Sequence, residues 1–211
     1  LLGFMVPIIL AVLINEMVHL KGLFRVSIYF PNVVPGVATV LMWWFMMDPG
    51  PGGLFNAIGA AFGLGPSEWI QNVNLTIPLI IATMTWKSAG STALIYIANL
   101  QGISQEMYEA ASIDGAGLIS RVRYITIPHV FNLARLMLIL QVIFVFQILF
   151  EPLVMTGGGP DNASISLMLL NYYYAFRDMH ASHASAVGVI VSLILLLLTA
   201  VYLKLSKEKD M

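Results

Sequence analysis

The sequence has no cysteine and very little charge. Because none of its 211 residues is Cys, disulfide bonds and thiolate metal sites are excluded. Charged residues make up 10% of the chain, whereas an ordinary soluble domain carries roughly 25%. So few charges cannot cover the surface of a soluble globule of this size. The formal net charge of -1 also excludes a general basic field for binding nucleic acid.

Apolar residues dominate instead, at 59% of the chain, and the mean hydropathy is +0.86. This composition predicts an all-α, polytopic membrane helical bundle, because a helix satisfies its own backbone polar groups inside lipid. Crossing the hydrocarbon core takes about 20 apolar residues. Four segments reach that length, at 26–47, about 75–99, about 131–155 and 184–203. Pro31 and Pro35 should kink or delay the first of them.

A fifth apolar segment, at about 1–15, is too short to cross on its own. Because it begins without Met and without a basic flank, we do not expect this segment to be a signal peptide. We expect the sequence to begin inside a helix of a longer chain; the alternative is a short buried helix. About five transmembrane helices are therefore expected, in a single transmembrane domain over 1–211.

The Lys and Arg residues predict the orientation of these helices. With five spans, one side receives eight basic residues and the other receives one, a clear positive-inside signal. The connections at 16–26 and 100–130 and the C-terminal tail are then cytoplasmic, whereas the Gly/Pro-rich segments 48–74 and 156–182 are external. The eight are Lys21, Arg25, Arg121, Arg123, Arg135, Lys204, Lys207 and Lys209, against Arg177 outside.

The connection at 100–130 is the one long polar loop, and it predicts a short helix. Ser104 can cap this helix through its hydroxyl, and Glu106 then lies in the positive first turn. A stripe of small side chains should face one way, and two glycines should end the helix. The stripe is Met107, Ala110, Ala111 and Asp114, and the glycines are Gly115 and Gly117.

After these glycines, we expect Thr126 to cap the next membrane helix, with Pro128 in its first turn. An acidic helix with an alanine face suits close contact with a partner protein. The alternative is a helix on lipid headgroups, but such helices usually place bulky apolar residues opposite Lys and Arg.

Several motifs give the sequence a family resemblance. Glu109-Ala110-Ala111, then Gly115, then Ile125-Thr126-Ile127-Pro128 resembles the EAA loop of binding-protein-dependent ABC importer permeases, with Ile127 in place of the usual Leu. The Asp114-Gly115-Ala116 triplet is similar to the version of this loop found in the carbohydrate-uptake branch of the family. Further similarities to the first permease of maltose, lactose and glycerol-3-phosphate importers are Trp86-Lys87, Glu151-Pro152 and the segment 155–160. The resemblance covers the whole chain, without the family's N-terminal first helix.

The resemblance implies a multi-pass subunit of the cell inner membrane that carries a sugar or sugar-like solute. Its expected partners are a second permease subunit, an ATPase dimer at the cytoplasmic face, an external solute-binding protein on the external segments, and membrane lipid. The EAA helix would couple the pathway to the ATPase. The residues expected to act there are Glu109, Ala110, Ala111, Asp114, Gly115 and Pro128.

No catalytic residues, metal ligands or nucleic-acid partner are expected in this chain. It has no G-x-x-x-x-G-K-[ST] loop, so it is not expected to be an enzyme or to hold a cofactor. Mg-ATP would bind to the partner ATPase. The alternatives are a secondary transporter driven by an ion gradient, which would need several mid-span carboxylates, and an ABC permease for a non-sugar solute.

Four polar or aromatic residues are candidates for the solute pathway. Lys87 lies midway along its span, where a charge usually faces a bundle interior or a wet cavity and has a partner such as Glu151. Its alternatives are a purely structural ion pair and a head group that snorkels to the interface. Trp86 could stack on a sugar ring. Gln147 and Glu151, four residues apart, should share one face of a helix.

Overall fold

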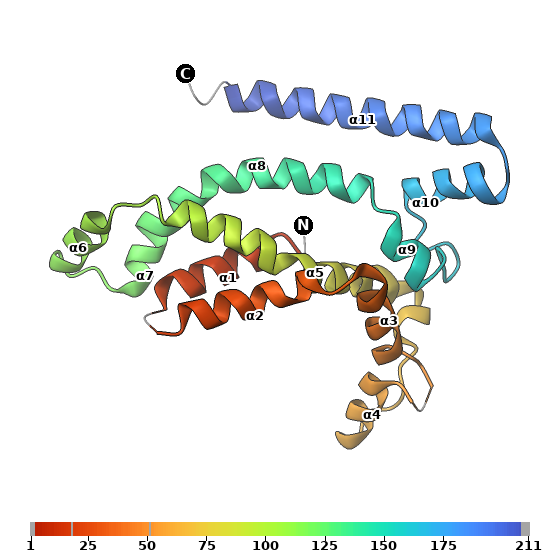
Figure 1. The fold of residues 1–211 in the computed structure, drawn as a ribbon, viewed down its shortest axis with the longest axis horizontal. Helices are drawn as coiled ribbons and strands as arrows, with labels where there is room; N and C mark the ends of the chain where they lie inside the picture. Colours follow the sequence, from red (N-terminus) through yellow and green to blue (C-terminus); the bar gives the residue numbers. More distant parts are fainter. Residues whose placement is uncertain (1–2, 18, 51, 208–211) are drawn as a thin grey trace. The chain divides into compact units, whose positions relative to one another are not determined.

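The computed structural model describes residues 3–17, 19–50 and 52–207, with the backbone alone for 205–207. All the regular elements within these ranges are helices, which confirms the predicted all-α fold class (Figure 1). Among the basic residues predicted to lie in the cytoplasmic C-terminal tail, Lys204 has a described side chain. Lys209 lies outside the described residues, as does the side chain of Lys207. The chain forms two compact units, each built from two stretches of sequence.

The first unit comprises Leu1–Pro35 and Ile81–Leu138. It contains α1 (Met5–Glu16), α2 (Lys21–Val33), most of α5 (Val73–Leu100), α6 (Gln105–Ile113), α7 (Leu118–Arg121), the π-helix η2 (Val122–Thr126) and the first part of α8 (Ile127–Phe146). Its apolar core joins α1, α5 and α8. The buried members include Ala11, Ile14, Ala93, Tyr96, Ile97, Val130 and Ala134.

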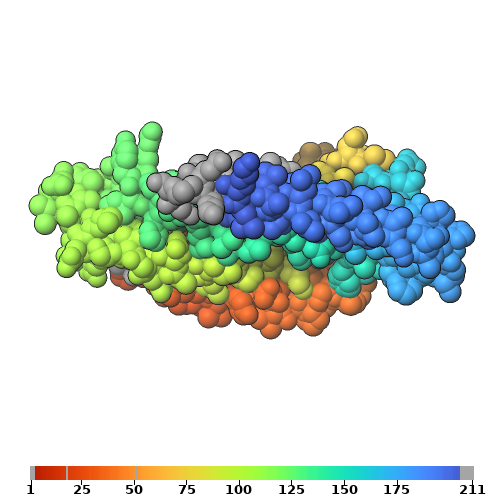
Figure 2. Space-filling model, turned by 90° about the horizontal axis from the view of Figure 1, so that it is seen from above, coloured from red at the N-terminus to blue at the C-terminus, as the bar shows by residue number. Residues whose placement is uncertain are grey.

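The second unit comprises Gly36–Ile80 and Ile139–Met211. It contains α3 (Gly36–Met46), α4 (Leu54–Ala61), η1 (Trp69–Gln71), the start of α5, the end of α8, α9 (Phe150–Met155), α10 (Leu167–Tyr172), the π-helix η3 (Tyr173–Arg177) and α11 (Ala181–Lys207). Helix α3 packs on α9, and α10 packs on α11. Figure 2 shows α11, the helix on which α10 packs, in blue.

The described helices fall on all five segments that the sequence predicts as spans. By length and composition, Leu118–Phe146 and Ala181–Lys204 can each cross a membrane, and a third crossing is possible if α2 and α3 form one broken span. The 28 residues of α5 extend about 42 Å at 1.5 Å each. Polar residues around Lys87 reduce the apolar character of α5. Helix α1 has 12 residues, so the number of five crossings stays a prediction.

The segment predicted to cross at 131–155 is not one helix. Helix α8 ends at Phe146, and α9 begins at Phe150. Pro152 explains the break, because a proline inside a helix lacks the N–H donor and its ring clashes with the carbonyl four residues earlier. By restarting at Phe150, the chain places Pro152 in a first turn, where no N–H is needed.

Candidate functional site

Helix α6 forms where the sequence predicts it, with one correction at its start. Ser104 occupies the N-cap position in an extended conformation, and Glu106 lies in the first turn. The hydroxyl of Ser104 makes no capping bond, so the predicted side-chain cap is wrong. Instead, the backbone carbonyl of Ser104 accepts a hydrogen bond from the N–H of Met107 at 3.2 Å. The helix therefore starts without a side-chain cap, and its acidic first turn complements the helix dipole.

The end of α6 is set by Gly115, as predicted. Gly115 has a φ of +81°, which favours glycine because it has no Cβ. Its N–H donates to the carbonyl of Ser112 at 3.1 Å, and the N–H of Ala116 donates to Ala111 at 2.8 Å. This pair of bonds is a Schellman motif. Gly117 has a φ of -70° and starts α7, so its predicted part in ending α6 is wrong.

One face of α6 is open to solvent in the described chain. Glu109, Ala110 and Asp114 are exposed, and Ala111 is half-buried beside them. Ile113, at the end of the helix, is 87% exposed, and Ile119, which follows in α7, is 81% exposed. A surface that combines carboxylates, alanines and uncovered isoleucines suits a protein partner better than water alone.

The other side of α6 is fastened to the start of the next membrane helix. The hydroxyls of Tyr108 and Thr126 lie 3.0 Å apart in a hydrogen bond, and Thr126 is completely buried. Arg121 donates through Nη1 to the hydroxyl of Ser112 at 3.0 Å. The hydroxyl of Ser112 in turn donates to the carbonyl of Tyr108. These bonds attach α6 to α7 and η2 at two places.

The membrane helix does not begin at Thr126, so the prediction of Thr126 as a cap is wrong. The helix is continuous from Leu118 to Phe146 and passes through the π-helical turns of η2. The N–H of Ile127 donates to the carbonyl of Val122, five residues back. Pro128 explains the wider turn, since a normal turn would place its ring against the carbonyl of Tyr124. Pro128 is the second residue of α8.

Lys87 has a definite partner in the first unit. Its ammonium donates a hydrogen bond of 2.8 Å to the carbonyl of Val34, which lies just beyond the end of α2. Pro35 follows, and α3 begins at Gly36, so the bond is made at a break in the chain. A positive charge at a helix C-terminus also complements the helix dipole.

Glu151 lies in the second unit, so its pairing with Lys87 stays a prediction. Trp86, half-buried next to Lys87 on α5, stays a predicted pathway residue.

Gln147 and Glu151 do not share a helix face, which corrects the prediction. Gln147 is an exposed residue in the turn after α8, whereas Glu151 is half-buried in the first turn of α9. The side-chain amide of Gln147 donates to the carbonyl of Ile143 at 3.3 Å. Ser166 connects this break to the start of α10. Its hydroxyl donates to the backbone carbonyl of Ile148 and accepts from the N–H of Leu169. Both residues thus lie at a helix interruption, where transporters place polar sites.

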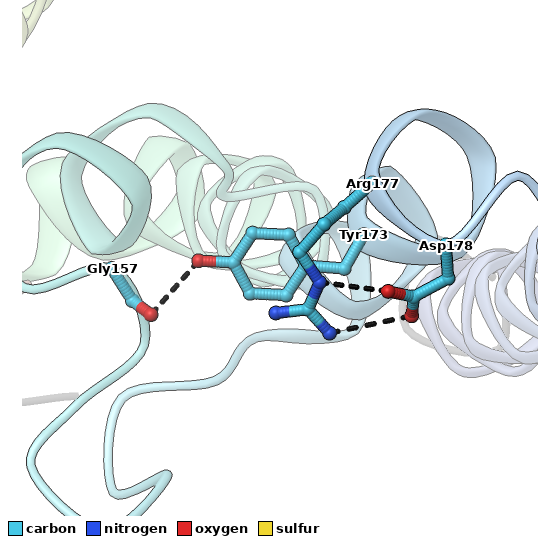
Figure 3. Close-up of polar contacts among 4 residues, drawn as sticks. All are labelled: Gly157, Tyr173, Arg177 and Asp178. Carbon is cyan, nitrogen blue, oxygen red and sulfur yellow. Dashed lines mark hydrogen bonds and ion pairs between the residues drawn. The ribbon is translucent and has the colours of Figure 1, made fainter.

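The segment after α9 is held to η3 by Tyr173. Its hydroxyl donates to the carbonyl of Gly157 at 2.8 Å, and the guanidinium of Arg177 lies 4.1 Å from the centre of its ring (Figure 3). Arg177 also donates to both carboxylate oxygens of Asp178. This hydrogen bonding lowers the pKa of Asp178 and raises that of Arg177, so the pair stays charged at neutral pH.

Sequence reasoning missed Asn56 as the organiser of the segment 48–69. Its side-chain amide donates to the carbonyls of Pro49 at 3.0 Å and Ser67 at 3.1 Å. Its oxygen accepts from the N–H of Ser67 and from the indole of Trp69, at 2.9 and 2.7 Å. Phe55 packs edge-on against both Trp43 and Trp69. No local pattern marks an asparagine that bonds across a loop, although its place among Gly and Pro residues fits such a role.

Comparisons with known proteins agree on one family. The family model described as "Binding-protein-dependent transport system inner membrane component" matches residues 3–208. The trehalose/maltose transport system permease protein of Thermococcus litoralis is 32% identical over 198 residues, which cover 93% of this chain and 66% of that protein. A probable ABC transporter permease protein of Bacillus subtilis is 32% identical over 203 residues, or 95% of this chain and 69% of that protein.

The sn-glycerol-3-phosphate transport system permease protein of Yersinia pestis is 28% identical, covering 99% of this chain and 70% of that protein. This chain thus spans about two thirds of the length of such curated relatives. The fold matches, with a TM-score of 0.90 and 21% identity, a crystal structure of a bacterial ABC transporter involved in the import of alginate. That match covers 98% of this chain and 73% of the other.

The family match confirms the predicted multi-pass localisation in the inner membrane and the predicted class of transport subunit. The helical segments, the exposed helix between α5 and α8, and the sequence relatives lead to the same assignment. The chain belongs to the family of binding-protein-dependent transport system inner membrane components, the permease subunits of ABC importers.

Proposed function

We propose that this chain forms half of the translocation pathway of an ATP-driven importer for a saccharide or sugar-like solute. A second permease subunit would supply the other half, and α6 would dock on a partner ATPase, where Mg-ATP binds. The observation that carries the proposal is the surface of α6, because this helix exposes Glu109, Ala110 and Asp114 while its opposite side is bonded to the next membrane helix.

The geometry of α6 suits the transmission of movement. The helix ends sharply at Gly115, so the docking face is short, and the carbonyls of Ala110, Ala111 and Ser112 accept hydrogen bonds at its end. Ala110 and Ala111 allow a partner's backbone to approach closely, and Glu109 or Asp114 can pair with a partner's Arg or Lys. Pro128 shapes the π-helical turns through which the docking helix joins the span.

The proposed solute class rests on the relatives. The names of several relatives refer to trehalose and maltose, arabinooligosaccharides, sulfoquinovosyl glycerol and diacetylchitobiose. Polyhydroxylated solutes need amides and carboxylates for their hydroxyls and aromatic faces for their rings. Gln147 and Glu151, at the break between α8 and α9, offer an amide and a carboxylate, and Trp86 on α5 offers an aromatic face.

An external solute-binding protein is the proposed source of the solute. A structure similar to this fold is described as a bacterial alginate ABC transporter in complex with an alginate pentasaccharide-bound periplasmic protein, at 22% identity. In this chain, side-chain hydrogen bonds from Asn56 hold the segment 48–69, and a side-chain hydrogen bond from Tyr173 holds the segment 156–178. Such preformed segments would present a fixed surface to a binding protein.

The absence of cysteine allows a direct test of docking. Single cysteines at Ala110 and Ala111 should crosslink to a cysteine on a co-expressed ATPase, and ATP should change the yield. Ala61→Cys is the matched control, since Ala61 is exposed at the end of α4 in a segment predicted to be external. Crosslinks from α6 that depend on ATP, with none from position 61, would support the proposal. Equal crosslinking to the ATPase from all three positions, or no crosslinking from α6, would contradict the proposal.

A further inference from the structure

The bonds that attach α6 to the membrane helix carry an inference beyond docking. We infer that the hydroxyl pair of Tyr108 and Thr126 is the joint through which a displacement of α6 reaches α8. This inference rests on the proposed function, because it supposes that α6 moves with a partner ATPase. It assigns a positioning role to two residues that do not touch solute or nucleotide.

Thr126 is buried where it bonds to Tyr108. Its side chain has no exposed surface, and its hydroxyl lies 3.0 Å from the hydroxyl of Tyr108. A buried hydroxyl without a partner destabilises the structure by more than the bond itself contributes. The pair therefore resists separation, and we expect Tyr108 and Thr126 to move together.

Helix α6 is held at two places. The Tyr108 hydroxyl bonds in the middle of the helix, and Ser112, in its last turn, accepts from Arg121 at 3.0 Å. One hydrogen bond leaves a helix free to swing about the point of contact. Two bonds a turn apart oppose that swing, so α6, α7 and η2 should move together.

Thr126 lies in line with the packed face of α8. Thr126, Val130 and Ala134 recur every four residues, and all three are buried, with exposed fractions of 0%, 2% and 6%. Val130 and Ala134 belong to the apolar core that α8 shares with α5. Thr126 is therefore the first buried residue of the stripe by which α8 packs into this unit. A force applied at its hydroxyl acts directly on the packed face of the helix, because cores are rigid.

The test measures coupling separately from docking. The variants Tyr108→Phe and Thr126→Val each remove one hydroxyl, and the double variant removes both and leaves no unpaired hydroxyl in the core. Thr126→Ser keeps a hydroxyl and should behave as the unmodified chain does. Tyr124→Phe is the matched control, since Tyr124 lies in the same π-helix and is 71% exposed. The assembled complex is reconstituted in vesicles, and solute transported per ATP hydrolysed is measured.

We expect each single variant to lower the solute transported per ATP by about fivefold, the factor that corresponds to one hydrogen bond. The double variant should lose no more than either single variant, because the two hydroxyls act as one pair. The Ala110→Cys crosslink to the ATPase should persist in all of them. Thr126→Ser and Tyr124→Phe should transport normally.

The outcomes separate this inference from the proposed function. If Ala110→Cys fails to crosslink in the otherwise unmodified chain, the proposed docking is wrong. If the crosslink forms but Tyr108→Phe and Thr126→Val keep the normal ratio, or their losses add in the double variant, the joint is wrong. Loss of the crosslink in the hydroxyl variants alone would also overturn the inference, since the pair would then orient α6 rather than transmit its movement.

Discussion

Lys87 shows how a backbone carbonyl can bind a charge on a helix that the sequence predicts to span the membrane. Its ammonium bonds to the carbonyl of Val34, which precedes Pro35 at the end of α2. The residue before a proline avoids the helical conformation, so α2 ends at the extended Val34 and the Val34 carbonyl lacks the donor that a continuing helix would supply. The long side chain of Lys87 supplies a donor from another helix. The ammonium thereby stabilises a break that prolines create, and this is a structural role that accounts for a costly residue.

Replacing Lys87 by Met tests this role at the residue scale. The variant keeps the side-chain length but removes the donor, so the free energy of unfolding should fall by about 1.5–3 kcal/mol, the contribution of a hydrogen bond to a charged group. Thermal unfolding in detergent measures the change. Lys204→Met, on an exposed residue of α11, is the control and should unfold as the unmodified chain does. Unchanged stability of Lys87→Met with loss of uptake would instead assign Lys87 to the solute pathway.

At the scale of elements, the sequence predicts helices well and their irregularities poorly. The end of α6 was predictable because the left-handed conformation of Gly115 depends on one residue type. The prolines were also visible, but local reasoning took Pro128 to mark a helix start. In the structure, π-helical turns accommodate Pro128, whereas the helix is interrupted before Pro152. Which solution a proline takes depends on packing along the whole helix, and sequence spacing does not contain that information.

Gly115 provides a test of the α6 terminus. Gly115→Val should cost about 1–2 kcal/mol locally, because a side chain is strained at a φ of +81°. We expect uptake to be lost while membrane insertion persists. Gly115→Asn is the matched control, since asparagine tolerates this conformation, and it should retain most of the uptake. Normal uptake by the valine variant would count against the coupling role of α6.

Gly90 provides a test of the close packing of α5 on α2. A Cβ at position 90 would lie 1.7 Å from the carbonyl oxygen of Ile28, so Gly90→Ala must push the two backbones apart. We expect a loss of about 1–3 kcal/mol in stability, as for other overpacked sites. Gly22→Ala, in α2 with nothing within 4 Å of the new atom, is the control and should be neutral or slightly stabilising. Equal stability of the two variants, measured by thermal unfolding, would show that α5 does not need this contact.

At the scale of the whole molecule, composition and motif order were enough to identify the family. Low charge and long apolar runs predict a helical membrane bundle, and the motifs around Glu109, Gly115 and Gly157 identify the family to which the chain belongs. The candidate site could be predicted only in part. The exposed residues of α6 follow from their spacing, whereas the partners of Tyr108, Asn56 and Lys87 are distant in sequence and depend on the tertiary structure.

The proposed function requires a separate ATPase to drive solute through this permease. The most direct measurement is solute uptake into vesicles that contain the assembled complex, with ATP supplied on the ATPase side and ionophores added to collapse all ion gradients. We expect uptake that requires ATP and continues when the gradients are gone. Uptake that follows an ion gradient without ATP or the ATPase would contradict it and would favour a secondary transporter.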